Sequence, residues 1–181
     1  MLKIKNYNSS ILHEISFSLK ENENLIILGE NGAGKSTLAK VLSNLISNDK
    51  VELLGENISK ISDLKRTQLI NYIPPKLSIF DEYVTLREFL ELSFIGNVNN
   101  QKIDEVIKLL NLKKLEDKYC KSFSSGEKQL LLLASAIMHN AQITIFDELT
   151  ANLDISRLKE VYEIFNSDLL KQKIIITHNL D

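Results

Sequence analysis

The fold of this chain is decided by the octapeptide Gly29-Glu30-Asn31-Gly32-Ala33-Gly34-Lys35-Ser36. It matches the pattern G-x-x-x-x-G-K-[ST] at every position, and it lies between an apolar run at 25–28 and an amphipathic pattern at 36–45. A strand, loop and helix in this order point successive backbone N–H groups and the positive helix end at a bound phosphate. The alternative is a glycine-rich turn with an exposed lysine, but the flanking strand and helix favour a phosphate-binding loop.

We therefore predict that this loop binds ATP with magnesium. Lys35 is expected to reach the β- and γ-phosphates, and the Ser36 hydroxyl to ligate Mg²⁺. The predicted nucleotide-binding residues of the loop are Gly29, Glu30, Asn31, Gly32, Ala33, Gly34, Lys35, Ser36 and Thr37.

An acidic pair follows a second apolar strand. Residues 143–146 are Ile-Thr-Ile-Phe, and Asp147 and Glu148 come next. Because ligands of parallel α/β sheets collect at the carboxyl ends of the strands, this pair should face the phosphates. Asp147 is then a magnesium partner and Glu148 the base that orients and deprotonates the attacking water. The alternative is that the pair caps a helix or lies in a solvated turn.

The hydrophobic pattern predicts an α/β fold with a largely parallel sheet. We expect strands at 15–19, 25–28, 143–146 and 173–177, and helices near 36–45, 85–94, 102–110, 113–118, 127–139 and 156–171. The continuous apolar run at 25–28 indicates a strand buried on both faces. Pro74-Pro75 breaks the pattern before a helical insert.

Composition excludes several classes of protein. With 22 basic and 24 acidic side chains, the chain lacks the positive charge expected of a nucleic-acid binder. It starts without the apolar core of a signal peptide, and its longest apolar run, at 130–138, is too short for a membrane span. Cys120 is the single cysteine, so the sequence predicts neither an intrachain disulfide nor a zinc site. We expect a cytosolic protein.

Three further segments carry a resemblance to a known family, the ATP-binding cassette (ABC) ATPases. Residues 123–129, Phe-Ser-Ser-Gly-Glu-Lys-Gln, resemble the LSGGQ signature, and residues 147–154 resemble the DEPTSALD segment. Residues 174–178 are similar to the strand and switch histidine of the family, and Tyr7 falls where an aromatic residue stacks on adenine. The resemblance implies a single ABC ATPase domain over 1–181. Its expected parts are a P-loop core sheet that is mostly parallel, N-terminal antiparallel β elements and a helical insert at about 76–140.

The resemblance also implies that two copies work together, head to tail. Ser124, Gly126 and Glu127 would cap the γ-phosphate bound by the opposite copy, and Asp154 would act across the interface. His178 would contact the γ-phosphate and hold the water with Glu148. Each has a simpler alternative: a structural histidine, a packing role for Tyr7, and a helix cap at Ser124.

The sequence departs from the family pattern at several points. Pro75 occupies the position of a glutamine that completes the magnesium shell and senses the transmembrane partner, and proline has no amide for either role. Ser125 replaces the first signature glycine, and Leu149 replaces a proline. The chain ends at Asp181, where relatives continue, so we expect one sheet edge to be left open.

The leading hypothesis is an ATPase subunit that powers membrane transport through a separate permease, peripheral on the cytoplasmic face of the membrane and dimeric with a second copy. Residues 64–96 further resemble the iron-siderophore and cobalamin import branch. Two alternatives stay open. One is a soluble ABC ATPase acting on DNA or ribosomes, and the other is a degenerate regulatory subunit that hydrolyses ATP slowly.

Overall fold

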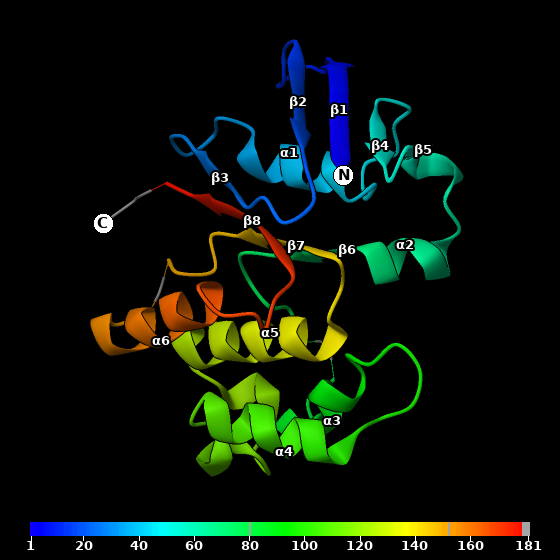
Figure 1. The fold of residues 1–181 in the computed structure, drawn as a ribbon. Helices are drawn as coiled ribbons and strands as arrows, with labels where there is room; N and C mark the ends of the chain where they lie inside the picture. The colour runs from blue at the N-terminus through cyan, green and yellow to red at the C-terminus, as the bar shows by residue number, and fades with distance from the viewer. Residues whose placement is uncertain (80, 152, 179–181) are drawn as a thin grey trace. The chain divides into compact units, whose positions relative to one another are not determined.

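The computed structural model describes residues 1–79, 81–151 and 153–178. The chain divides into two compact units (Figure 1). The first contains Met1–Tyr72, Ala141–Glu148 and Lys171–Asp181, and the second contains Ile73–Asn140 and Leu149–Leu170. No helix among the described residues is long and apolar enough to cross a membrane.

The first unit contains a four-stranded sheet in which one central strand pairs in parallel with both of its neighbours. Its order is β3-β8-β7-β6, with β3 at Leu25–Leu28, β8 at Gln172–Thr177, β7 at Ile143–Asp147 and β6 at Ile70–Ile73. Both β3 and β7 pair with β8 in parallel, and the last partners are Leu28 with Thr177 and Asp147 with Ile176. The carboxyl ends of these three strands therefore meet at one edge of the sheet. The phosphate loop, Glu148 and His178 follow directly from those ends.

The prediction that β3 is buried on both faces is wrong. Its residues alternate between partly buried and exposed, and Ile26 and Leu28 are 53% and 48% exposed. The reason is its place at the edge of the sheet, where it pairs with β8 on one side. Full burial belongs to β7 instead, which is buried at all five positions in the middle of the sheet.

An antiparallel sheet completes the first unit. Its order is β2-β1-β4-β5, with β2 at Ile15–Leu19, β1 at Leu2–Tyr7, β4 at Val51–Leu53 and β5 at Glu56–Asn57. Helix α1 (Lys35–Leu42) contributes Leu38, Ala39, Val41 and Leu42 to a hydrophobic core that also contains side chains from both sheets. The first unit is completed by a 3₁₀ turn at Ile58–Lys60 and helix α2 at Asp63–Leu69.

The second unit is helical. Helix α5 (Ser125–His139) buries ten of its residues and packs against α3 (Leu86–Glu91) and α4 (Asn100–Leu109). Short 3₁₀ turns at Lys113–Leu115 and Cys120–Ser122 lead into α5, and α6 covers Ile155–Phe165. Here the expected helix at 113–118 is only a 3₁₀ turn, and α6 ends before the expected residue 171. The insert predicted at about 76–140 lies within the first stretch of this unit.

Candidate nucleotide-binding site

The phosphate loop requires glycine at its last turn. Gly34 precedes α1 with a φ of 88°, a left-handed conformation that side chains disfavour. A Cβ atom at this position would lie 2.8 Å from Cγ2 of Ile11 and 2.9 Å from Cδ2 of Leu12. Both the backbone angle and the close approach of the 9–12 turn therefore exclude larger residues.

A cavity of about 400 Å³ opens at this loop. Its lining residues all belong to the first unit: Ile11, Asn31, Gly32, Gly34, Lys35, Ser36, Thr37 and Glu148. The structure thus brings six of the predicted loop residues and the predicted base Glu148 to one cavity. Residue 29 and residue 30 contribute their carbonyl groups, which accept hydrogen bonds from Lys35.

Lys35 is the central cation of the cavity. Only 8% of it is exposed, and its Nζ donates to the carbonyl oxygens of Gly29 at 2.7 Å and Glu30 at 2.9 Å. The same Nζ lies 3.5 Å from Oε1 of Glu148. Because a buried ammonium is costly unless it is well partnered, these contacts hold the charge in place beside the N-terminus of α1. An anion in this cavity would meet the lysine and the helix end together.

Glu148 occupies a constrained position. Its φ is 53°, in the left-handed region that non-glycine residues rarely adopt, and its N–H donates to the carbonyl of Ile176 at 2.9 Å. Its Oε1 also lies 3.6 Å from Nδ1 of His178, whose side chain is partly exposed. Lys35, Glu148 and His178 therefore converge at the carboxyl edge of the parallel sheet. Backbone strain of this kind is often found at functional sites.

Asp147 is fully buried, and its two carboxylate oxygens have different surroundings. Oδ2 accepts a hydrogen bond of 2.9 Å from the Tyr72 hydroxyl, whereas Oδ1 is buried without a hydrogen-bond partner among the described residues. Burial, followed by the hydrogen bond to Asp147, raises the pKa of Tyr72 well above its usual range, so its hydroxyl remains a neutral donor. The Tyr72 hydroxyl therefore donates a hydrogen bond to the Asp147 carboxylate without neutralising its negative charge.

These residues fit a magnesium ion that is held largely by a ligand's phosphate oxygens. Within the described ranges there is no group of three or more His, Cys, Asp or Glu side chains that could hold a metal by itself. Mg²⁺ is commonly bound through one or two protein oxygens, phosphate oxygens and water. Ser36 lines the cavity and carries a hydroxyl oxygen, and Asp147, which is not among the lining residues, carries the uncompensated Oδ1, so both supply oxygens of the kind that Mg²⁺ binds.

The signature segment starts a helix with a reciprocal cap. The Ser124 hydroxyl accepts from the Glu127 N–H at 3.3 Å, and Oε2 of Glu127 accepts from the Ser124 N–H at 2.8 Å. The bond from the Ser124 backbone lowers the pKa of Glu127. Gly126 lies in the first turn of the same helix, α5. The predicted alternative of a helix cap at Ser124 is thus present in the structure.

Two other predicted residues have structural partners. Asp154 caps α6, since its Oδ1 accepts from the Arg157 N–H at 3.0 Å. Tyr7 is only 8% exposed within the core of the first unit, and it does not line the cavity. Sequence reasoning missed Ile11, which is 52% exposed and does line it. The only signal was an apolar residue in a polar stretch, which many surface turns share.

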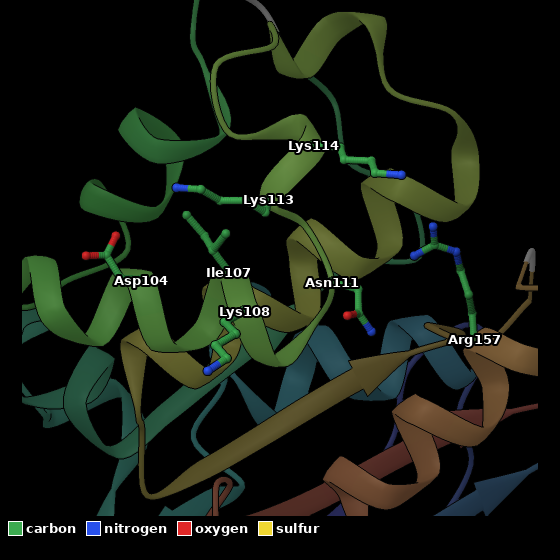
Figure 2. A pocket seen from close by; sticks show the side chains of 7 residues that line it. All are labelled: Asp104, Ile107, Lys108, Asn111, Lys113, Lys114 and Arg157. Carbon is green, nitrogen blue, oxygen red and sulfur yellow. The ribbon is translucent and has the colours of Figure 1, made fainter.

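A larger cavity, of about 800 Å³, lies in the second unit (Figure 2). Its lining residues are Asp104, Ile107, Lys108, Asn111, Lys113, Lys114 and Arg157, and none of them was predicted to act in the site. Asp104 pairs with Arg87 and Lys113 pairs with Glu116, so two of its charged groups are already engaged within the unit. Size alone does not make this cavity the reactive site, because the convergent lysine, carboxylate and histidine lie at the phosphate loop.

The fold and this loop define the class of protein, a P-loop nucleotide-binding domain of the α/β type. The sequence model of the ABC transporter family matches residues 12–151. The chain belongs to this family and is an ABC-type ATPase domain.

The relatives agree with this assignment. The chain is 34% identical over 177 residues to a putative ABC transporter ATP-binding protein of Clostridium tetani, a match that covers 94% of this chain and 40% of that protein. It is 31% identical over 190 residues to the zinc import ATP-binding protein ZnuC of Buchnera aphidicola, covering 99% of this chain and 75% of that protein. The dimeric post-hydrolysis structure of the ATP-binding cassette MJ0796, bound to ADP and Pi, superposes with a TM-score of 0.81 at 21% identity, over 99% of this chain and 89% of that one.

Proposed function

We propose that this chain binds MgATP in the cavity at the phosphate loop and hydrolyses it to power transport across a membrane. The observation that carries the proposal is the convergence of the loop, Lys35 and Glu148 on one cavity in the first unit. The N–H groups of the loop and the Lys35 ammonium supply positive charge for the β- and γ-phosphates. Gly34 permits the left-handed turn that leads from the loop into α1.

Glu148 is the proposed general base. Its Oε1 lies near both Lys35 and His178, so the carboxylate is oriented before the nucleotide arrives. On binding, the γ-phosphate would draw the Lys35 ammonium toward itself and leave Glu148 to accept a proton from water. His178 would hold that water and contact the γ-phosphate. Magnesium, held through Ser36 and Asp147, would offset the charge that develops on the phosphate oxygens.

The proposed active form is a head-to-tail pair of copies. The N-terminus of α5 is a second place where an anion is favoured; Ser124 is its N-cap, and Gly126 and Glu127 lie in its first turn. In the pair, these residues would close over the γ-phosphate bound by the other copy, and Asp154 would act across the interface. The existence of a dimeric structure with the same fold supports this arrangement.

Transport through a separate permease is the proposed use of the energy, with this chain peripheral on the cytoplasmic face. A relative supports it, since ZnuC of Buchnera aphidicola is a zinc import ATP-binding protein. The narrower resemblance to the iron-siderophore and cobalamin branch stays a prediction.

A regulatory subunit that hydrolyses ATP slowly is the second candidate. Two departures from the family pattern, Pro75 and Ser125, line the same cavity of about 400 Å³ in the second unit. Gln129 lines it too, and both polar atoms of its side chain are buried without a partner in the described part of the chain. A segment that lacks its usual glutamine and leaves a buried amide unpaired supports this second candidate.

Comparison of the wild type with Glu148→Gln separates these candidates. We expect MgATP turnover to fall about 100-fold or more while ATP binding is retained, because the amide cannot accept the proton. Glu21→Gln, an exposed change in the same unit, is the matched control and should leave turnover unchanged. Equal rates in the wild type and Glu148→Gln would contradict the enzyme and support the regulatory subunit.

A further inference from the structure

We propose that Tyr72 is a positioning residue for the metal site, and that it fixes which oxygen of Asp147 faces the magnesium ion. The inference rests on the proposed binding of MgATP and adds a residue that the sequence did not single out. It starts from the hydrogen bond of 2.9 Å between the Tyr72 hydroxyl and Oδ2 of Asp147, which joins residues 75 positions apart in the chain.

The two strands that carry these residues make the contact possible. Tyr72 lies on β6 and Asp147 at the end of β7, and β6 is the neighbour of β7 in the parallel sheet. Asp147 has no exposed surface, so bulk water does not set the orientation of its carboxylate. The tyrosine hydroxyl is the only hydrogen-bond partner that the described residues give to this carboxylate.

The kind of hydrogen-bond donor at position 72 determines whether Asp147 keeps a charge and an oxygen that can bind a cation. A lysine or arginine at position 72 would neutralise Asp147 and compete with a metal, whereas a hydroxyl donates one hydrogen bond and leaves the negative charge. With Oδ2 engaged, Oδ1 is the oxygen that remains buried and uncompensated. Buried polar atoms are normally satisfied, so an oxygen in this state, at the end of β7 and one residue before Glu148, is suited to a metal ion or a metal-bound water.

Phenylalanine at position 72 tests the role of the hydroxyl. The change keeps the ring but leaves both oxygens of Asp147 without a donor, so the carboxylate is free to turn away from its oriented position. We expect the dissociation constant for Mn²⁺, measured by electron paramagnetic resonance with a non-hydrolysable ATP analogue, to rise about tenfold. Binding of the same analogue with EDTA present should be unchanged. Tyr162→Phe, an exposed tyrosine on α6, is the matched control.

The double variant Asp147→Asn/Tyr72→Phe tests whether Tyr72 acts on the metal through Asp147. If it does, adding Tyr72→Phe to Asp147→Asn should weaken Mn²⁺ binding no further. Unchanged Mn²⁺ affinity in Tyr72→Phe would overturn the positioning role alone. Equal losses with Mn²⁺ and with EDTA would also overturn it, because they would show a general structural effect. If the wild type binds the analogue under neither condition, the proposed function fails, and the positioning role fails with it.

Discussion

Most of the loop residues that line the cavity could be predicted because their pattern is local. Gly34 and Lys35 act within one turn of chain, so the loop motif identifies both from sequence. Residues that reach the cavity from elsewhere could not be predicted this way. Ile11 approaches Gly34 only through the fold, and Tyr72 meets Asp147 only because β6 and β7 are neighbours in the sheet.

Paired variants test whether Ile11, which lines the cavity, or Tyr7, which was predicted to stack on adenine, contributes to nucleotide binding. Ile11 is exposed at the cavity, whereas Tyr7 is buried in the core. We expect Ile11→Ala to raise the ATP dissociation constant several-fold, because the bound nucleotide loses an apolar contact. The free energy of unfolding should change little, because the Ile11 side chain is exposed in the unliganded protein. Tyr7→Leu should lower the free energy of unfolding by about 1–3 kcal/mol and leave ATP affinity unchanged. Isothermal calorimetry and urea unfolding measure the two quantities.

The reverse outcome would support stacking at position 7. If Tyr7→Leu weakens ATP binding in a folded protein while Ile11→Ala does not, the expectation that Ile11 contacts the nucleotide is wrong.

Elements with a clear amphipathic or buried pattern were predicted near their observed bounds. Examples are β2, α5, β7 and β8, where hydrophobic periodicity reflects burial directly. The residue pattern gave no indication of β4 or β5, which have three and two residues. It also predicted the wrong burial for β3, since a run of apolar residues does not tell whether a strand is central or at an edge.

The cap of α5 gives a prediction at the level of the element. Ser124 and Thr85 form the same reciprocal cap, on α5 and α3 respectively. Ser124→Ala and Thr85→Ala should each lower the free energy of unfolding by about 1 kcal/mol, measured by urea unfolding. If Ser124 also contacts the opposite nucleotide, only Ser124→Ala should in addition slow MgATP turnover. Equal turnover in both variants would leave Ser124 a helix cap and contradict its proposed role in the dimer.

At the scale of the whole molecule, the family and the class of fold follow from the order of the motifs along the chain. The residue pattern indicates an α/β domain, and the segments at 123–129 and 147–154 narrow it to the ABC type. The matches of the family model and of the solved structures confirm both. The chain spans 40% of the Clostridium tetani relative, so the activity of a whole transporter remains a proposal here.

The central claim is that the cavity around Lys35 is an ATP site, and equilibrium binding of MgATP to the wild type, Lys35→Ala and Lys40→Ala tests it most directly. Both lysines are on α1, but Lys35 is buried at the cavity and Lys40 is exposed. The wild type and Lys40→Ala should bind MgATP with the same affinity, and Lys35→Ala should bind at least about tenfold more weakly, because it loses a charge-assisted contact to phosphate. Absence of binding to the wild type, or equal affinity in all three, would contradict the account.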